Sequence, residues 1–93
     1  MPASREHLHA LYKLFASVKT EKEARSLLED ILTPQELDAV AERWQLIRAL
    51  ASGKSQRTIA RELKLSISKI TRGSRMLKYG SGGFQHFLQK LKK

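Results

Sequence analysis

The residues with the clearest chemical character are the basic side chains of the stretch Ser55–Lys78, SQRTIARELKLSISKITRGSRMLK. From Lys54 to Lys78 the chain carries eight Lys or Arg residues and a single acidic residue, Glu62. Lys and Arg side chains donate charged hydrogen bonds to phosphate groups. This density of positive charge therefore favours binding to a polyanion.

The charge is distributed unevenly along the 93 residues, a length that predicts one domain over residues 1–93. Residues 1–52 contain seven Lys or Arg and eight Asp or Glu, a net charge of −1. Residues 53–93 contain eleven Lys or Arg and one Glu, a net charge of +10. This asymmetry predicts a scaffold joined to a polyanion-binding face. The alternative is that the basic residues only confer solubility.

The basic stretch has the pattern of two short helices joined by a tight turn. We place a helix-turn-helix at about 55–77, in which Ser55 and Ser66 can cap the two helices and Leu65 is the apolar residue of the turn. The second helix, at about 67–77, would present its first residues to base edges in the major groove of DNA. The sequence therefore predicts a single helical DNA-binding domain.

The expected DNA contacts fall into two groups. Small hydroxyl groups and an aliphatic side chain on the second helix suit hydrogen bonds to base edges and contact with a thymine methyl group. Long cationic side chains suit phosphate contacts, which set the register without reading sequence. The residues predicted to bind DNA are Gln56, Arg57, Ile67, Ser68, Lys69, Thr71 and Lys78, with Lys54, Arg61 and Arg75 as further candidates for phosphate contacts.

Capping signals and apolar periodicity predict helices in the rest of the chain as well, so the fold class is all-α with six helices. Helix starts are expected near Ser4, Thr20 and Thr33, and the third helix should end just before Gly53. A flexible joint at residues 79–83 precedes the last helix. Strand signals are absent from the sequence.

Each helix outside the basic stretch carries apolar residues at helical spacing, and we expect these stripes to be buried. The third helix is apolar on most of its circumference, which a core of 93 residues can barely cover. We therefore infer a partner subunit; the alternative is a central helix inside a monomeric bundle. The stripes are Leu8, Leu11, Tyr12 and Phe15; Ala24, Leu27, Leu28 and Ile31; Val40, Ala41, Trp44, Ile47 and Ala51; and Phe84, Phe87, Leu88 and Leu91.

The sequence offers no pattern for catalysis. There is no cysteine, His7 and His9 point to different sides of a helix, and His86 is isolated. We find no paired carboxylates and no phosphate-binding glycine loop, so we expect neither an enzyme nor a metal site. No apolar run approaches the roughly 20 residues that cross a bilayer, and the first residues lack the order of a signal peptide. We expect a soluble, cytoplasmic protein.

A different class of function is an RNA-binding or helical assembly module whose basic face reads no sequence. RNA readers usually present stacking aromatic side chains on the binding face. Here Tyr79 alone among the aromatic residues lies near the basic stretch, because the others fall on apolar stripes. This distribution favours double-stranded DNA.

Three segments, LTPQELDAVAERW, SQR and ITRGSRMLK, resemble the tryptophan repressor family over roughly residues 27–78. The resemblance implies an intertwined homodimer of six-helix subunits and a transcriptional repressor that binds operator DNA. It also implies L-tryptophan as corepressor, placed so that the two recognition helices match successive major grooves. The alternative is a helix-turn-helix regulator of the same fold with a different effector or none.

The resemblance also assigns a ligand pocket. In the family the indole ring lies between two arginines, matched here by Arg43 and Arg72. A guanidinium group can stack on an aromatic ring and can also bind a carboxylate through two parallel hydrogen bonds. Met76 stands where a serine of the family helps to hold the ligand's amino group. The ligand-binding residues that the resemblance implies are Leu32, Thr33, Arg43, Arg72, Gly73 and Met76.

The chain departs from the family pattern elsewhere too. Asp30 stands where an apolar pocket residue is expected, and Ser66 replaces a glycine. Asp30 could contact the ligand's ammonium group, or it could pair with Arg43 and close the pocket. For Arg43 and Arg72 the alternative is an ordinary position on a helix surface or facing DNA. The link between the third helix and SQR is one residue shorter than in the best-known repressors. This length, and the KYG at residues 78–80 after the recognition helix, resemble an uncharacterised branch of the family.

Overall fold

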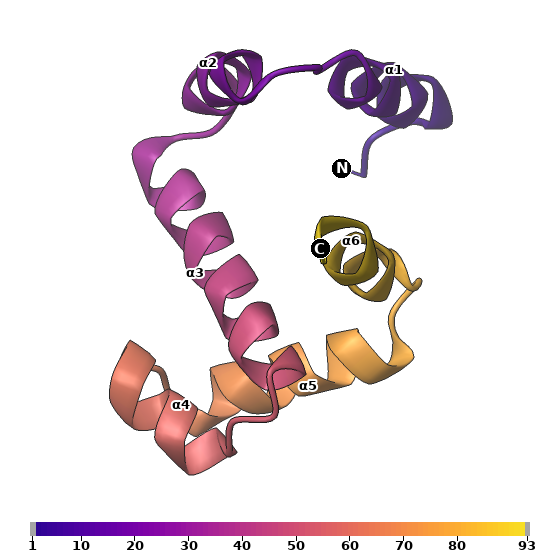
Figure 1. Ribbon diagram of the computed structural model, residues 1–93. Helices are drawn as coiled ribbons and strands as arrows, with labels where there is room; N and C mark the ends of the chain where they lie inside the picture. The colour runs from indigo at the N-terminus through magenta and orange to yellow at the C-terminus, as the bar shows by residue number, and fades with distance from the viewer. Residues whose placement is uncertain (1, 93) are drawn as a thin grey trace. The chain divides into compact units, whose positions relative to one another are not determined.

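The computed structural model describes residues 2–92, and the helices within that range number six, as the sequence predicts (Figure 1). No strand occurs among these residues, which confirms the all-α fold class. None of the described helices is long and apolar enough to span a membrane. The helices are α1 (Arg5–Ala16), α2 (Glu21–Ile31), α3 (Pro34–Ala51), α4 (Gln56–Leu63), α5 (Ile67–Tyr79) and α6 (Gly83–Leu91).

The structure divides into two compact units. The first, residues 1–37, contains α1, α2 and the first turn of α3, and the second, residues 38–93, contains the rest of α3 together with α4, α5 and α6. The helix-turn-helix lies wholly within the second unit. The organisation as one domain over residues 1–93 stays a prediction.

Side-chain caps begin the first helices where the sequence places them. At α3, Thr33 and Glu36 form a reciprocal capping box, since the Thr33 hydroxyl accepts from the Glu36 amide at 3.1 Å and the Glu36 carboxylate accepts from the Thr33 amide at 2.8 Å. At α2 the Thr20 hydroxyl accepts from the Glu23 amide, but the Glu23 carboxylate accepts from the amide of Lys19, one residue before the cap. These bonds satisfy amide groups that a helix start leaves without partners.

Local hydrogen bonds also define the helix-turn-helix. Ser55 caps α4 and Ser66 caps α5, each hydroxyl accepting from the amide three residues further on. Between the helices Lys64 adopts a left-handed conformation with φ 55°, which few residues other than glycine adopt. The Leu65 amide donates to the carbonyl of Ala60 at 3.2 Å, and the Leu65 side chain is buried. The two helices on either side of this turn are α4 (Gln56–Leu63) and α5 (Ile67–Tyr79), so α5 continues for two residues beyond 77.

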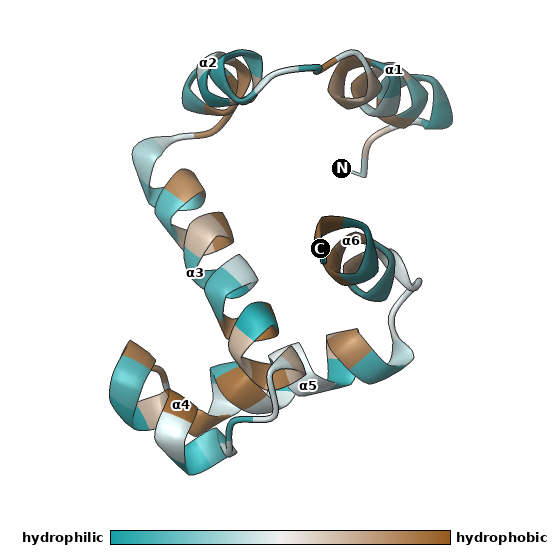
Figure 2. Ribbon diagram, viewed as in Figure 1, coloured by the Kyte–Doolittle hydropathy of each residue, from teal (hydrophilic) through white to brown (hydrophobic). Residues whose placement is uncertain are grey.

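The core of the second unit lies where α3, α4 and α5 meet. Leu46 from α3, Ile59 from α4, Leu65 from the turn and Ile70 from α5 form one buried cluster. Figure 2 shows hydrophobic segments of the three helices at this meeting point. Burial of each such side chain contributes about 1.5–3 kcal/mol, so this small cluster sets the orientation of α5.

Gly73 allows α5 to approach α3 closely. It is buried, and a Cβ atom at this position would lie 2.6 Å from Cδ2 and 3.2 Å from Cγ of Leu46. Leu46 is itself only 4% exposed, so its side chain has little room to move aside. The glycine is therefore required by packing, independently of any role in a ligand pocket.

The expected burial of the apolar stripes is wrong for the single chain. α1 and α2 contain no buried residue, and Tyr12 of α1 is 62% exposed. In α3 only Leu46 and Ile47 are buried. α6 also has no buried residue, and Leu91 is 63% exposed. Periodicity reports which face of a helix is apolar, whereas burial depends on what is brought against that face.

The predicted joint at residues 79–83 is shorter in the structure. Tyr79 ends α5 and Gly83 begins α6, so the joint comprises residues 80–82. Gly82 has φ 95°, in the left-handed region that favours glycine. The side-chain amide of Gln85 donates to the carbonyl of Leu77 at 2.9 Å and so ties α6 to the end of α5.

We predict that Gly73→Ala destabilises the protein by about 1 kcal/mol or more, although alanine favours helices over glycine. The reason is the clash with Leu46, since overpacking a core costs about 1–3 kcal/mol and the gain in helix propensity is at most about 1 kcal/mol. Urea denaturation at fixed protein concentration measures the change. Gly83→Ala is the matched control, because a Cβ there meets no atom closer than 3.9 Å. Equal stabilities of the two variants would contradict the packing role.

Candidate nucleic-acid interface and ligand pocket

The outer face of α5 carries four of the residues that were predicted to contact DNA. Ile67, Ser68, Thr71 and Lys78 are all exposed, while Ile70 is fully buried on the opposite side of the helix. Ile67 is 56% exposed even though it is a large apolar residue. Six residues line a shallow depression along this face, namely Ile67, Ser68, Thr71, Arg72, Arg75 and Met76.

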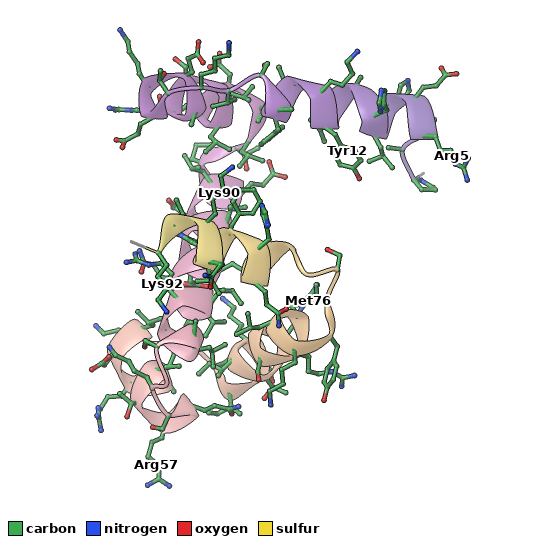
Figure 3. The ribbon with its side chains drawn as sticks, turned by 45° about the vertical axis from the view of Figure 1, so that its right-hand side comes forward. Arg5, Tyr12, Arg57, Met76, Lys90 and Lys92 are labelled. Atoms are coloured by element: carbon green, nitrogen blue, oxygen red, sulfur yellow. The ribbon has the colours of Figure 1, made fainter. Side chains whose placement is uncertain are left out.

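The start of α4 places two further predicted residues at the surface. Gln56 and Arg57 follow the N-cap Ser55 and are exposed. Figure 3 shows the Arg57 side chain extending away from the helices, with its guanidinium group in solvent. A long cation in this position can reach a phosphate or a guanine edge without a change in the helices.

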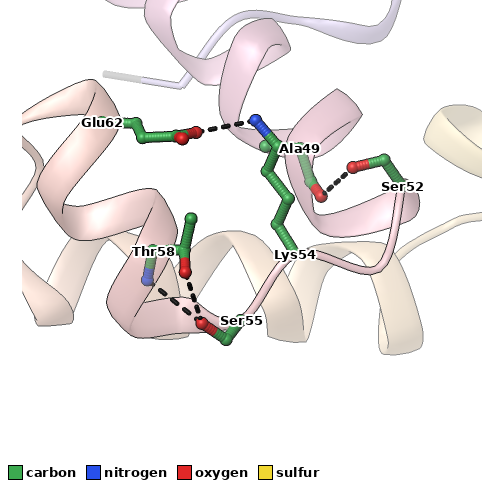
Figure 4. A network of polar contacts seen from close by, with 6 residues as sticks. All are labelled: Ala49, Ser52, Lys54, Ser55, Thr58 and Glu62. Atoms are coloured by element: carbon green, nitrogen blue, oxygen red, sulfur yellow. Dashed lines mark hydrogen bonds and ion pairs between the residues drawn. The ribbon is translucent and has the colours of Figure 1, made fainter.

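Two lysines, one within the basic stretch and one immediately before it, form ion pairs with carboxylates. The ammonium group of Lys69, predicted to bind DNA, donates to Glu42 of α3 at 3.1 Å. The ammonium group of Lys54 donates to Glu62 of α4 at 2.7 Å (Figure 4). Neither pair lies within one helix, so helical spacing alone does not indicate them.

A pocket of about 170 Å³ lies within the second unit, between α3 and α5. Its charged lining residues are Arg43 and Glu42 from α3 and Lys69 and Arg72 from α5. The remaining lining consists of Ala39, Leu46, Ile47, Leu65, Gly73, Met76 and Phe84. Two guanidinium groups beside apolar walls suit a ligand that combines a flat apolar ring with a carboxylate.

Comparison with known proteins gives the family. The family model described as Trp repressor protein matches residues 6–92 of this chain. The chain belongs to this family. No solved structure gives a significant match.

Curated relatives agree with this assignment. A Trp operon repressor homolog of Chlamydia trachomatis is 40% identical over 82 residues, which cover 87% of each chain. A Trp operon repressor homolog of Mannheimia succiniciproducens is 42% identical over 67 residues, covering 71% of this chain and 66% of the relative. The uncharacterized protein YerC of Bacillus subtilis is 28% identical over 87 residues, covering 94% and 84%. The resemblance seen in the sequence is thereby confirmed.

The structure brings together four of the six ligand-binding residues that the Trp repressor resemblance implies. Arg43, Arg72, Gly73 and Met76 all line the pocket between α3 and α5. Leu32 and Thr33 lie in the first unit, where Leu32 follows the last residue of α2. The Thr33 hydroxyl is used to cap α3.

Among the lining residues of the pocket that the sequence reasoning did not assign to it, two add a distinct chemistry. Glu42 precedes Arg43 and supplies the single carboxylate of the lining, and Phe84 from the start of α6 adds an aromatic wall. The ring of Phe84 also stacks on Trp44, with 6.3 Å between centroids. For Glu42 an available signal was its position beside Arg43 on a helix expected to line the pocket. For Phe84 the sequence contains no such signal, because the position of this residue beside the pocket depends on how the chain turns at residues 80–82.

Glu62 has the one clearly displaced pKa among the described residues. The hydrogen bond from Lys54 and the positive charge of Lys54 lower the pKa of this carboxyl group, and the charge of Arg61 adds a smaller effect. Around this pair, Ser55 binds both the amide and the hydroxyl of Thr58, and Ser52 donates to the carbonyl of Ala49 (Figure 4). The pair therefore bridges the segment before α4 and α4 itself.

We predict that Lys54→Ala raises the pKa of Glu62 towards the ordinary glutamate value, because it removes both main causes of the lowered pKa. In the wild type the folded pKa lies below the unfolded one. The pair therefore stabilises the fold above the unfolded pKa, and this contribution is lost as the pH falls through the folded pKa. NMR titration of the Glu62 carboxyl carbon measures the change. Arg61→Ala should have a smaller effect, and a Glu62 pKa that Lys54→Ala leaves unchanged would contradict the assignment.

Proposed function

We propose that this protein is a sequence-specific DNA-binding transcription repressor that acts as a homodimer and uses L-tryptophan as corepressor. The observation that carries the proposal is the outer face of α5, where Ile67, Ser68 and Thr71 are exposed at the start of a helix whose other side is buried. Membership of the Trp repressor family supports the same regulatory role.

The chemistry of α5 suits the major groove. Hydroxyl groups of Ser68 and Thr71 can donate to and accept from base edges, and Ile67 can contact a thymine methyl group. Ile70 and Gly73 anchor the opposite side of the helix in the core, so the exposed side chains start from a fixed backbone. A reading surface on a rigid element discriminates better than one on a mobile loop.

Cations around this face suit the phosphate backbone. Arg57 lies at the start of α4 and Lys78 in the last turn of α5, and both are exposed. Phosphate contacts release counterions from DNA, so affinity should fall steeply as the salt concentration rises. Such contacts orient the protein on the duplex, while the first turns of α5 supply the discrimination.

The exposed apolar stripes support a homodimer. α1 presents Leu8, Leu11, Tyr12 and Phe15 to solvent in the single chain, and each is at least 37% exposed. In the second unit, Trp44, Met76, Phe84, Phe87 and Leu91 line an apolar groove of about 520 Å³ together with residues 80–83. Apolar surface on this scale marks an interaction site in a small protein. A symmetric partner would also place two recognition helices on one duplex.

The lining of the pocket between α3 and α5 fits an aromatic amino acid. Arg43 and Arg72 can stack on a ring or bind a carboxylate, and Leu46, Ile47 and Phe84 supply apolar contact. Met76 can contact a ring through its sulfur, but its thioether is a much weaker acceptor for the ligand's ammonium group than a serine hydroxyl. The volume of about 170 Å³ is below the roughly 300–1,000 Å³ of most ligand sites, so part of the ligand would stay outside this lining.

A second candidate is a regulator of the same fold with a different effector or none. Met76 in the pocket favours it, because this residue leaves the ligand's amino group without the hydroxyl that the family pattern supplies. The two candidates share the DNA face, so they differ only in the response to L-tryptophan.

We predict that Thr71→Ala and Ile67→Ala each reduce discrimination between the preferred and other DNA sequences by about 1–3 kcal/mol, the usual value of a base contact. Lys78→Ala should instead weaken binding to all duplexes alike, because a phosphate contact carries no sequence information. Selection of bound sequences followed by fluorescence anisotropy measures both effects. Uniform weakening by Thr71→Ala and Ile67→Ala would contradict their role as base contacts.

We predict that L-tryptophan raises the melting temperature, with a stabilisation of about 2.7 kcal/mol at a ligand concentration one hundred times the dissociation constant. Arg43→Ala should abolish this shift and leave ligand-free DNA binding intact, because Arg43 lines the pocket from α3. Arg48→Ala is the matched control, an exposed arginine of the same helix that is not among the pocket residues. No shift at millimolar L-tryptophan would eliminate the corepressor and favour the second candidate.

A further inference from the structure

An ion pair joins α3 to α5 at the wall of the pocket. The ammonium group of Lys69 donates to the carboxylate of Glu42 at 3.1 Å, across 27 residues of sequence. Both residues line the pocket beside Arg43 and Arg72. Lys69 also belongs to the first turn of α5, whose exposed residues we assign to DNA. One side chain is thus shared between the pocket and the DNA face.

We propose that Glu42 is the ammonium-binding residue of the pocket and that ligand binding there releases Lys69 to DNA. Without ligand, the Glu42 carboxylate accepts from Lys69. With an aromatic amino acid bound, the carboxylate accepts from the ligand's ammonium group, and Lys69 becomes available to a phosphate. The proposal rests on the proposed function, since it names how the same pocket selects its ligand and transmits binding.

The charges of the pocket favour this division of roles. Arg43, Lys69 and Arg72 are three cations, and Glu42 is the single carboxylate in the lining. Within this lining, a ligand carboxylate therefore has arginines available, whereas Glu42 is the one anionic side chain for a ligand ammonium group. Met76 leaves this role open, because a thioether accepts hydrogen bonds only weakly. A ligand without an ammonium group can use the arginines but has nothing with which to displace Lys69.

The ion pair is weak enough to be exchanged. The side chain of Lys69 is 63% exposed and that of Glu42 is 44% exposed. Exposed pairs of this kind contribute little to stability, because water and salt screen them and because two long side chains lose freedom. The released ammonium group can then replace the lost pair by a phosphate contact. Each added phosphate contact steepens the dependence of log affinity on log salt concentration by about 0.9.

The test compares two ligands that differ at the ammonium group. L-tryptophan carries ring, carboxylate and ammonium, whereas indole-3-propionate lacks only the ammonium. Calorimetry measures the affinity of the full-length protein for each ligand. Fluorescence anisotropy with a labelled duplex, repeated over a range of salt concentrations, measures DNA affinity and its salt slope. We expect wild-type protein to bind L-tryptophan more tightly and, with it, to show a salt slope steeper by about 0.9 per subunit.

Two variants separate the halves of the exchange. Glu42→Gln should lose about tenfold or more in affinity for L-tryptophan, the usual effect of losing a hydrogen bond to a charged group, and should bind indole-3-propionate as the wild type does. Its salt slope should be steep with either ligand and without ligand, because Lys69 has no carboxylate partner. Lys69→Gln should show the same salt slope of DNA affinity with both ligands, because this variant has no lysine to release.

Glu62→Gln is the matched control. It removes the same charge and frees a lysine, Lys54, in the same way, but Glu62 does not line the pocket. It should therefore keep the wild-type preference for L-tryptophan over indole-3-propionate. A general effect of charge on the fold would change this preference in both glutamate variants.

Each outcome decides between the alternatives. Loss of the ligand preference in Glu42→Gln, together with its steep ligand-free slope, would support the exchange. Equal affinity of wild-type protein for the two ligands, or an unchanged slope in Glu42→Gln, would overturn it and leave the corepressor role of L-tryptophan intact. Absence of binding heat for both ligands in the wild type would overturn the corepressor role itself and the exchange with it.

Discussion

The contact of Gly73 on α5 with Leu46 on α3 is the constraint on which the functional surfaces of the second unit depend. It lets α5 approach α3 closely, because Gly73 has no side chain and the Leu46 side chain packs directly against its backbone. Ile59 and Leu65 complete the cluster and fix α4 against the same pair of helices. The direction in which α5 presents its outer face follows from this packing, and both Gly73 and Leu46 also line the pocket beside it.

Helix α5 contributes to both the outer face and the pocket, because different sides of the helix carry side chains of different chemical character. Ser68 and Thr71 face solvent, Ile70 and Gly73 face the core, and Lys69 and Arg72 lie at the boundary beside the pocket. A ligand that binds at the boundary can change α5 only through a difference in affinity between two arrangements of these groups. In the exchange proposed above, the Lys69–Glu42 pair would provide two such arrangements, one with the lysine on the Glu42 carboxylate and one with it on a DNA phosphate.

The energetics of the chain indicate why such a protein would act as an assembly. Its buried hydrophobic core is limited to Leu46, Ile47, Ile59, Leu65 and Ile70 among the described residues. Much of the apolar surface of α1, α2 and α6 stays exposed in the single chain. A small core supports only marginal stability. Covering those faces with a second subunit would contribute burial that the chain alone does not provide.

The sequence by itself determined the six helices, the side-chain caps at the start of the first five, the family, and the face of α5 that was assigned to DNA. Capping and helical periodicity involve residues only a few positions apart. The caps formed by Thr33 with Glu36 and by Ser66 with the amide of Lys69 can therefore be predicted from the sequence. Only the tertiary structure decided that Gly73 meets Leu46, that Lys69 pairs with Glu42 and that the apolar stripes of α1 and α6 stay exposed. These features join residues far apart in the chain or depend on what covers a surface, and neither is encoded in local spacing.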